Sequence, residues 1–496
     1  MPTSSDTLAP KPGIAKRAHT LRENGVSAAG AIVMAVAGSA PGYSIAASTA
    51  ILIGAAGLSS AGALLWCGLP MLGIAWAFAY LGRADVNAGA AYAWVARALH
   101  PILGFFSGWA LIVSSTIFMV AGALPAGSAT VSLFAPDLIN NVPLVTGVGA
   151  IWFLVMATCV LVGVKLTARA QWIMTTIEVG LLVLFAILAL VRASTGLVGG
   201  TPFSWDWFSL SHFAGPGAFI GAALVAAFYF WGWDVSANLS EETENSKKSS
   251  GIGGIIGVIV VFVLFEIFTI AIQIVLPAKA IHDNPSNVLG VLGEAIWPGI
   301  GGKLLIIAVM LSTIATLETT LIQVTRTLFA MGRDHTIPKA FGRTHATWRT
   351  PAVATFVVAG VALVLFIGSN FLGSVSTIMG YAITSIGLQI AFYYSLAGVA
   401  VVVAYRKIIF DSVKNLIFIG LWPAIGAAFM GWTFVVSLPI TPAPVLGIGI
   451  GALALGIVPV IVFWKKGSAY FSRRPLELPS ELTGGIPIIE TPRARN

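Results

Sequence analysis

The sequence predicts an all-α membrane protein with twelve transmembrane helices, and three observations lead to this fold class. Of the 496 residues, 57% are hydrophobic and only 9% are charged, whereas a soluble domain carries about 25% charged residues. Several apolar stretches reach the roughly 20 residues that a helix needs to cross a bilayer, among them 255–276, 351–368 and 446–463. The alternation typical of barrel strands is absent, so helices are the expected spanning elements.

The expected spans are twelve apolar segments separated by short polar clusters. They lie near residues 26–56, 60–81, 98–134, 143–164, 168–193, 214–239, 251–276, 299–331, 351–369, 373–404, 416–437 and 442–464. With the N-terminus in the cytoplasm, all of the 27 Lys and Arg residues fall on the cytoplasmic side except Arg192, Lys279 and Lys303. Cytoplasmic loops carry an excess of Lys and Arg, so this distribution supports both the span count and the orientation. It also accounts for the net charge of +8 without a nucleic-acid partner.

Both ends of the chain are polar and are expected to lie in the cytoplasm. We expect an N-terminal tail over residues 1–24, because no apolar core with a cleavage site follows its basic residues as in a signal peptide. Residues 467–496 are rich in Pro and lack apolar periodicity, which predicts a disordered C-terminal tail. The protein is therefore expected to be a multi-pass protein of the cytoplasmic membrane. Cys67 and Cys159 fall inside apolar spans, so neither a disulfide nor a metal site is expected.

The first expected span is interrupted by five small residues, Gly38-Ser39-Ala40-Pro41-Gly42. Pro removes a backbone donor and clashes with the preceding turn, and Gly costs about 1 kcal/mol in a helix interior. We therefore expect this helix to unwind in the middle of the membrane. A simple proline kink is the alternative.

The sixth expected span carries a second interruption at Phe230-Trp231-Gly232-Trp233-Asp234. Gly232 and the adjacent acid indicate a break, and the alternative is an aromatic lipid-facing patch with Asp234 near an interface. The two interruptions fall in the first helix of two five-helix units, spans one to five and six to ten. Paired interruptions of this kind are typical of transporters with inverted repeats, because unwound backbone is tolerated where it lines a solvated cavity.

These and other motifs resemble the amino acid–polyamine–organocation superfamily, and in particular its amino acid permeases, over about residues 24–410. The first break resembles the family's Gly-Ser-x-x-Gly signature, with Pro41 as a departure. Residues 89–109 are similar to the motif that joins the family's second and third helices, although Asn87 and Ala residues replace its usual Pro and paired Gly. The strongest match is the second break followed by Glu-Glu-Thr-Glu-Asn at 241–245. Further matches are Arg326, Arg333-Asp334, Ile337-Pro338-Lys339 and Thr350-Pro351.

The resemblance implies a core of ten helices in two inverted repeats over residues 25–410, followed by two peripheral helices over 411–466. It also implies alternating access, with the substrate held between helices one and six, both unwound. The candidate substrate-binding residues are Ser39, Ala40, Pro41, Gly42, Tyr43, Phe230, Trp231, Gly232, Trp233, Asp234, Glu318 and Gln389. Trp231 and Trp233 could stack on the substrate or contact an ammonium through a cation–π interaction, and Phe230 could act as a gate. Simple packing is the alternative for each aromatic side chain.

Acidic residues inside the membrane need an explanation, because a charge at mid-bilayer costs about 2.5–3.5 kcal/mol on insertion scales. Glu178 lies where proton-coupled relatives often carry a Lys that replaces a sodium ion between helices one, five and eight. An acid there could bind and release a proton, help to hold a cation, or serve only as a structural residue. Ser312 and Thr313 form the hydroxyl pair expected near the same cation site, so these three are the candidate coupling residues.

The remaining acids and charges have two interpretations each. Glu318 could pair with a substrate ammonium or make a helix–helix hydrogen bond, and Asp234 could bind substrate or brace the unwound backbone. Glu266 is expected to contact a neighbouring helix, and Tyr393, near Gln389, is expected to pack. The charged residues expected in the cytoplasm could form a salt-bridged inner gate or a solvated cluster: Glu241, Glu242, Glu244, Arg326, Arg333 and Asp334.

The predicted function is secondary active transport that imports an amino acid or a related amine, coupled to protons, with sodium as the other possible ion. A polyamine or diamine transporter or exchanger is the alternative, and a channel is a more distant one. An enzyme is not expected, because the sequence contains neither a His/Cys/acid cluster nor a phosphate-binding loop. We expect no cofactor and no metal. The expected partners are the small-molecule substrate, the coupling ion and membrane lipid, with the protein a monomer or a homodimer.

Overall fold

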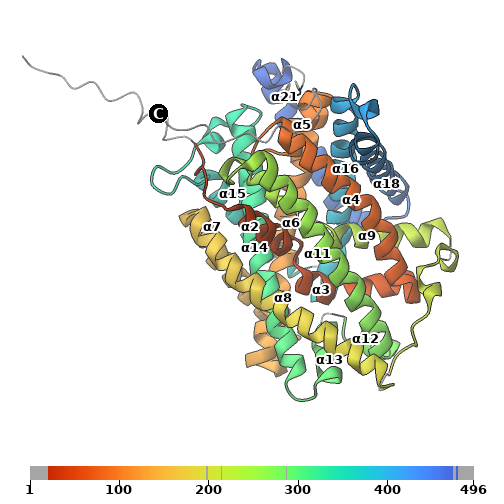
Figure 1. The fold of residues 1–496 in the computed structure, drawn as a ribbon. Coiled ribbons are helices and arrows are strands. Elements are labelled where there is room, and N and C mark those ends of the chain that lie inside the picture. The colour runs from red at the N-terminus through yellow and green to blue at the C-terminus, as the bar shows by residue number, and fades with distance from the viewer. Residues whose placement is uncertain are drawn as a thin grey trace, which may run out of the picture.

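The computed structural model describes residues 20–196, 199–213, 215–285, 287–371, 373–472, 476 and 478. Most of the two predicted tails, residues 1–19 and nearly all of those beyond 472, lie outside the described residues. The described chain is built from helices and contains no β-strand, only one isolated bridge between Val26 and Thr243. Figure 1 shows these helices packed side by side as a bundle.

The long helices follow the predicted apolar segments closely. They are α2 (Ala28–Ser39), α3 (Pro41–Ala56), α4 (Ser60–Ala84), α6 (Pro101–Phe134), α7 (Val142–Val162), α8 (Val164–Ser194), α11 (Ser246–Val275), α14 (Gly301–Arg333), α15 (Ala352–Ser369), α16 (Val375–Tyr405) and α18 (Trp422–Ser437). The last apolar segment consists of α19 (Ala443–Leu446), η9 (Gly447–Gly451), α20 (Ala452–Ala454) and α21 (Ile457–Lys465). Shorter helices are α5 (Ala91–Ala98), α9 (Pro216–Tyr229), α10 (Val235–Asn238), α12 (Ala278–Asp283) and α13 (Val288–Ile296).

Ten helical stretches in the described part of the chain are long and apolar enough to cross a membrane. The first, Ala28–Ala84, is counted as one stretch although it contains α2, α3 and α4. The predicted segment 214–239 contains α9, which is apolar but has only 14 residues. The prediction of helical spans is thus confirmed, while the count of twelve stays a prediction.

Local sequence explains where several helices begin. Proline is the first residue of α3, α6 and α9, where its fixed φ suits a helix start and its missing N–H is not needed. The side chain of Asn141 accepts a hydrogen bond from the Leu144 amide at the start of α7, and Ser374 caps α16 in the same way. These signals set where the helices begin, and therefore where unpaired backbone N–H groups lie in an otherwise apolar bundle.

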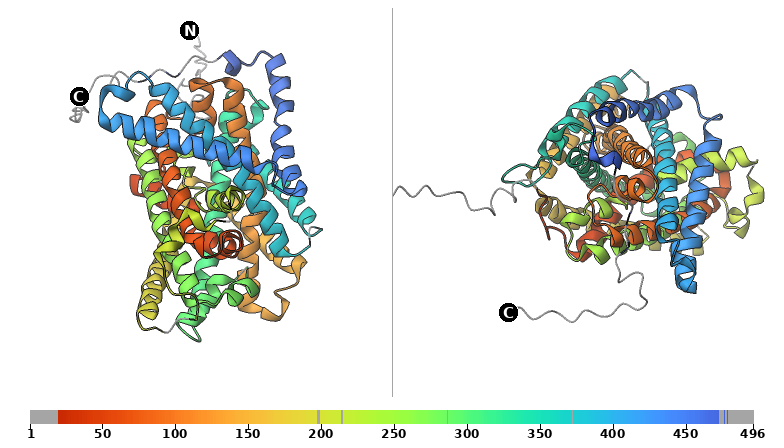
Figure 2. Two further views of the ribbon diagram at one scale, coloured as in Figure 1. Left: turned by 90° about the vertical axis from the view of Figure 1, so that its right-hand side faces the viewer. Right: turned by 90° about the horizontal axis from the view of Figure 1, so that it is seen from above.

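Burial separates inner helices from outer ones. In the most apolar part of α14, 78% of the residues are buried, whereas in the most apolar part of α8 only 33% are buried. α14 packs against α3, α6, α8 and α2, and α2 also packs against α11. α18 packs on α16 and α4, and the blue C-terminal helices lie along the outside of the bundle in Figure 2. The interrupted helices α2 and α3 therefore lie beside the most buried of the ten long apolar stretches.

The bundle has two chemically different ends. We call the end with α5 and the last turn of α14 the basic end, since Arg97 and Arg333 lie there. We call the opposite end, with α12 and α13, the distal end; Figure 1 shows α5 and α12 at opposite ends. The helix α6 runs from the basic end to the distal end, so its residue numbers give depth along the bundle.

Candidate functional site

The first predicted break is confirmed at the predicted residues. α2 ends at Ser39 and α3 begins at Pro41, and the residue between them, Ala40, has φ 48° and ψ 64°, which is the left-handed region. A residue other than Gly in that region costs on the order of 1–3 kcal/mol, so surrounding contacts must hold it there. Ala40 is buried. The chain is interrupted at this point, which excludes a simple proline kink in a continuous helix.

The second predicted break is also confirmed. α9 ends at Tyr229 and α10 begins at Val235, and the segment between them passes through Gly232 with φ 96°. All five residues of this segment are buried, with Trp231 only 4% exposed and Asp234 fully buried. The alternative of a lipid-facing aromatic patch is therefore wrong.

The two breaks touch each other through their backbones. A Cβ atom added to Gly232 would lie 2.1 Å from the carbonyl oxygen of Gly38, and one added to Gly38 would lie 2.2 Å from that of Gly232. Real Cβ atoms do not approach so closely, so glycine is required at both positions. The positive φ of Gly232 imposes the same requirement independently. Segments almost 200 residues apart thus meet at one point in the bundle.

Side chains from α8 and α14 hold the start of α3. The Gly42 amide donates to Oε1 of Glu178 at 2.9 Å, and the Tyr43 amide donates to Oγ of Ser312 at 3.0 Å. The Thr316 hydroxyl donates to the Gly38 carbonyl at 3.0 Å, on the other side of the break. Helix N-termini carry partial positive charge, which favours the Glu178 carboxylate in this position. Glu178 and Ser312, predicted as coupling residues, are therefore brought directly to the first break.

Three other predicted residues near this point bond within or between helices. The Thr313 hydroxyl donates to the Val309 carbonyl of its own helix, and the Ser39 hydroxyl donates to Ala35 in the same manner. The amide of Gln171, on α8, donates to Oε2 of Glu318 at 2.7 Å. Glu318 thus makes the helix–helix hydrogen bond that was one of its two interpretations.

The second break is held from α16. The Tyr393 hydroxyl donates to Oδ2 of Asp234 at 2.8 Å and accepts from Nε1 of Trp231 at 2.7 Å. One tyrosine therefore ties together the two ends of the unwound segment. Tyr393 was expected only to pack, and its hydroxyl instead fixes the orientation of two candidate substrate-binding side chains.

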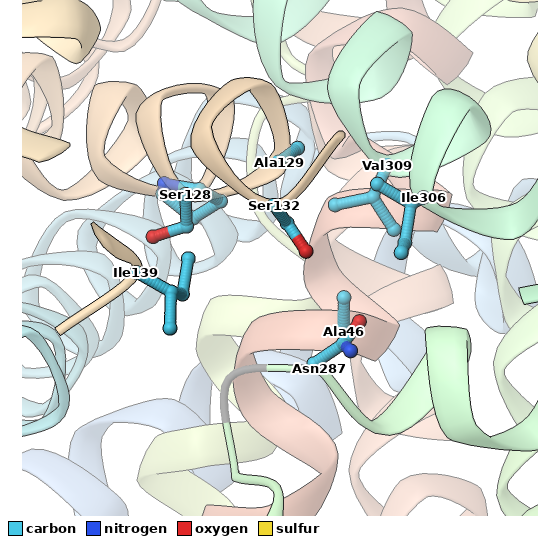
Figure 3. Close-up of a pocket in the computed structure, with 9 residues that line it drawn as sticks. Ala46, Ser128, Ala129, Ser132, Ile139, Asn287, Ile306 and Val309 are labelled. Atoms are coloured by element: carbon cyan, nitrogen blue, oxygen red, sulfur yellow. The ribbon is translucent and has the colours of Figure 1, made fainter. Parts of the chain in front are cut away.

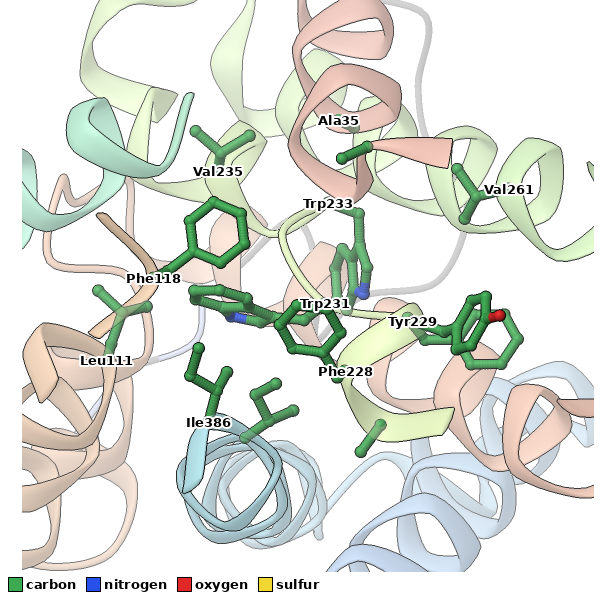
Figure 4. Close-up of a cluster of buried hydrophobic side chains, with 14 of the residues drawn as sticks. Ala35, Leu111, Phe118, Phe228, Tyr229, Trp231, Trp233, Val235, Val261 and Ile386 are labelled. Atoms are coloured by element: carbon green, nitrogen blue, oxygen red, sulfur yellow. The ribbon is translucent and has the colours of Figure 1, made fainter. Parts of the chain in front are cut away.

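Four aromatic rings form a layer beside the breaks, which we call the aromatic layer: Tyr43, Phe118, Phe228 and Trp231. Tyr43 and Phe118 have ring centroids 5.6 Å apart, and Phe118 and Trp231 are 5.5 Å apart. Phe228 lies 6.1 Å from both Tyr43 and Phe118. Figure 4 shows Phe118, Phe228 and Trp231 gathered between α6, α16 and the second break. Edge-to-face packing of this kind closes the space between the helices.

A small pocket and a tighter void lie on opposite sides of the aromatic layer. The distal pocket has a cavity volume of about 70 Å³ and is lined by Ala46, Pro125, Ser128, Ala129, Ser132, Ile139, Asn287, Ile306 and Val309; Figure 3 shows its side chains. The basic-side void leaves no room for a water molecule and is lined among others by Ser107, Gly108, Asp234, Asn238 and Thr327. Along α6 the void comes first, Phe118 next and the pocket last, so the aromatic layer separates the two.

Ion pairs close the basic end beneath the void. Arg326 pairs with Glu242 through two hydrogen bonds of 2.8 and 3.2 Å, and both side chains are fully buried. Arg333 pairs with Glu241 at 2.8 and 2.9 Å in a partly exposed position. The Ala88 amide, from the segment between α4 and α5, also donates to Glu241. The inner pair is buried, which excludes a fully solvated cluster and leaves a salt-bridged closure.

Three predicted residues face neighbouring helices. The Phe230 ring packs against Phe262 and Phe265 of α11, with centroids 5.8 and 5.6 Å away. Gln389 donates to the Gly449 carbonyl in η9 at 2.9 Å. The Trp233 ring packs between Phe78 of α4 and Tyr394 of α16. The structure thus gathers Ser39–Tyr43, Trp231, Gly232, Asp234, Glu178 and Ser312, and places the others around them.

Sequence reasoning missed several residues of this site, although two of them carry a signal. Gln171 lies two helical turns before Glu178, and Thr316 lies one turn after Ser312, so each shares a face with a predicted residue. Phe118 carries no such signal. Glu266, which was expected to contact a neighbouring helix, lies near Cys67 of α4 with both carboxylate oxygens buried.

Ten apolar helical stretches in the described residues, the first of them containing the break between α2 and α3, define a multi-pass membrane protein. The family model for amino acid permeases matches residues 24–463, so the chain belongs to the amino acid permease family. The low-affinity putrescine importer PlaP of Escherichia coli K12 is 25% identical over 346 residues, which cover 66% of this chain and 69% of that protein. A methylthioribose transporter of Bacillus subtilis is 26% identical (68% and 76% covered), and its branched-chain amino acid permease BcaP is 27% identical (64% and 68% covered).

Proposed function

We propose that this protein is a secondary active transporter that imports an amino acid or a related amine across the cytoplasmic membrane by alternating access, driven by protons. One observation carries the proposal: two interrupted helices meet at Gly38 and Gly232, beside buried carboxylates. The named relatives transport putrescine, methylthioribose and branched-chain amino acids, which supports a small solute as the cargo.

The same geometry supports alternating access. The distal pocket lies on one side of the aromatic layer, and the buried pair of Arg326 and Glu242 closes the other side. Because basic residues mark the cytoplasmic face of membrane proteins, the basic end is the cytoplasmic one. The described conformation is then closed toward the cytoplasm. Transport requires that the aromatic layer part and that the ion pairs at the basic end separate.

Glu178 is the proposed coupling residue. Its carboxylate accepts the Gly42 amide at the start of α3, where the helix favours a negative charge. Proton binding would remove that charge and weaken its attraction to α3, which frees the first break to move. Ser312 and Thr313 lie nearby and are the residues that would contribute hydroxyl oxygens if sodium took the role of the proton.

The proposed topology has twelve spans in a core of two repeats and two peripheral helices. α2 with α3 would form the first span, and α9 with α10 the sixth, so that each repeat begins with a broken helix. The core would cover residues 25–410. α18 and the segment from α19 to α21, which pack on α16, would form the two peripheral helices.

Uptake by purified protein in proteoliposomes tests the function. A panel of labelled amino acids and amines should be offered under an inward proton gradient and, separately, under an inward sodium gradient. We expect accumulation with the proton gradient and its loss when a protonophore is added. Accumulation with sodium alone would contradict the coupling, and failure of every amine-bearing solute to compete would contradict the substrate class.

A further inference from the structure

We propose that the substrate is an amine without a carboxylate, because Glu178 occupies the place where an amino acid would bind its own carboxylate. This assignment rests on the proposed transport function and names its substrate class. In effect, the protein supplies from α8 the negative group that an amino acid would bring with it.

The amides of the first break are all engaged. A carboxylate that leaves water must find N–H donors or a cation, since an unpaired buried charge is very costly. In the first turn of α3, Pro41 has no N–H, the Gly42 amide donates to Glu178 and the Tyr43 amide donates to Ser312. The Ser44 amide donates to the Ala40 carbonyl at 2.8 Å. A substrate carboxylate would therefore have to displace Glu178 or Ser312.

The second break carries a negative group of its own. Its backbone between Gly232 and Val235 includes Asp234, whose carboxylate is fully buried and would repel a second negative group at short range. No buried cation compensates: among the described buried residues the only Lys or Arg is Arg326, and Glu242 already accepts from it with both oxygens.

The buried interior instead offers acceptors for a cation. Glu178, Asp234 and Glu318 are fully buried acids, and around them the described buried residues include no Lys or Arg except Arg326. An ammonium group has three donors and no acceptor, so it can pair with such carboxylates. The face of Trp231 in the aromatic layer adds a cation–π surface next to Asp234. We assign Asp234 as the partner of the substrate ammonium.

Pairs of solutes that differ only in a carboxylate test the assignment. Suitable pairs are 1,4-diaminobutane with ornithine, 1,5-diaminopentane with lysine, and 2-phenylethylamine with phenylalanine. Binding to the purified full chain should be measured by competition without any ion gradient. We expect the amine to bind at least tenfold more tightly than its amino acid in each pair that binds. Equal or tighter binding of the amino acids would overturn this assignment and leave the transport function intact, whereas failure of all six solutes would overturn both.

A variant of Glu178 tests the physical cause. Glu178→Ala frees the Gly42 amide, so the preference for the amine should shrink at least tenfold, through a gain in amino acid binding. Glu178→Gln keeps an oxygen for that amide and should keep most of the preference. Glu266→Ala, a control that removes another acid with buried carboxylate oxygens but without a hydrogen bond to either break, should leave the preference within twofold of wild type. An unchanged preference in Glu178→Ala would overturn the role of Glu178; if that variant does not fold, the wild-type pairs still decide the substrate class.

Discussion

The two breaks touch each other, but the hydrogen bonds that stabilise them run in opposite directions between the break and its neighbouring helices. At the first break the backbone donates, and side chains of α8 and α14 accept: Glu178 takes the Gly42 amide and Ser312 takes the Tyr43 amide. At the second break a side chain of the break itself accepts, and Tyr393 of α16 donates to Asp234. The first break therefore depends on the charge of an outside residue, whereas the second carries its own charge.

This difference suggests that the first break responds to the proton and the second break to the substrate. A proton that binds Glu178 weakens the hydrogen bond from the Gly42 amide at the first break, without contact between Glu178 and the substrate. A substrate ammonium that reaches Asp234 alters the second break directly. Because the backbones of Gly38 and Gly232 are in contact, a movement of either break requires the other break to move as well. The contact between the glycines is the structural link that coupling would need.

The largest expected effect follows from breaking that contact. Gly232→Ala places a Cβ atom 2.1 Å from the Gly38 carbonyl oxygen and forces a positive φ on alanine. Overpacking and backbone strain each cost about 1–3 kcal/mol, so uptake should fall at least twentyfold and the thermal midpoint should drop. Gly221→Ala on α9 is the matched control, because nothing lies within 4 Å of its added Cβ. Near-normal uptake by Gly232→Ala would mean that the two breaks need not touch.

The next largest effect concerns α14, which holds the first break and, further along, the segment after the second. Arg326→Ala leaves Glu242 buried without its cation, which typically costs about 3–5 kcal/mol. Thermal denaturation in detergent should show a clear loss of stability. Arg333→Ala, which removes a partly exposed pair, should cost less. Equal losses in the two variants would contradict the burial of the inner pair.

Tyr393→Phe tests the hold on the second break alone. Loss of the hydroxyl leaves Asp234 and the Trp231 indole without their shared partner, at about 1–3 kcal/mol for each group. We expect lower stability and weaker amine binding, measured by thermal shift and by competition. Tyr381→Phe, on the same helix but within a separate apolar cluster, is the control and should change neither. Unaltered amine binding in Tyr393→Phe would separate Asp234 from the substrate.

The smallest of these effects is expected at the first break. Ser312→Ala removes one acceptor and leaves the Tyr43 amide unpaired, at about 1–3 kcal/mol for a single group. The thermal midpoint should fall, but less than in Tyr393→Phe. Thr313→Val is the control, since its hydroxyl bonds only to its own helix. A larger effect in the control would contradict the contact of Ser312 with α3.

The sequence was sufficient to locate the breaks, because Pro41, Gly38 and Gly232 act on their own backbone. Their partners could not be found in the same way: Glu178 is 136 residues from Gly42, and Ser312 is 269 residues from Tyr43. Glu178 was singled out by the cost of a buried charge, without any indication that it would cap α3. Gln389 shows a different limit of prediction from sequence. It is a buried polar residue on α16 that was expected to bind substrate, but its side chain donates a hydrogen bond to Gly449 in the last apolar segment.

Transport by the Glu178→Gln variant is the most direct test of the central claim, that a proton on this residue drives movement of the first break. Gln keeps the shape and one oxygen for the Gly42 amide but cannot gain or lose the proton. Accumulation under an inward proton gradient should fall at least tenfold, while amine binding and gradient-free exchange stay within about threefold of wild type. Glu266→Gln should accumulate normally. Proton-driven accumulation by Glu178→Gln at the wild-type level would contradict the account.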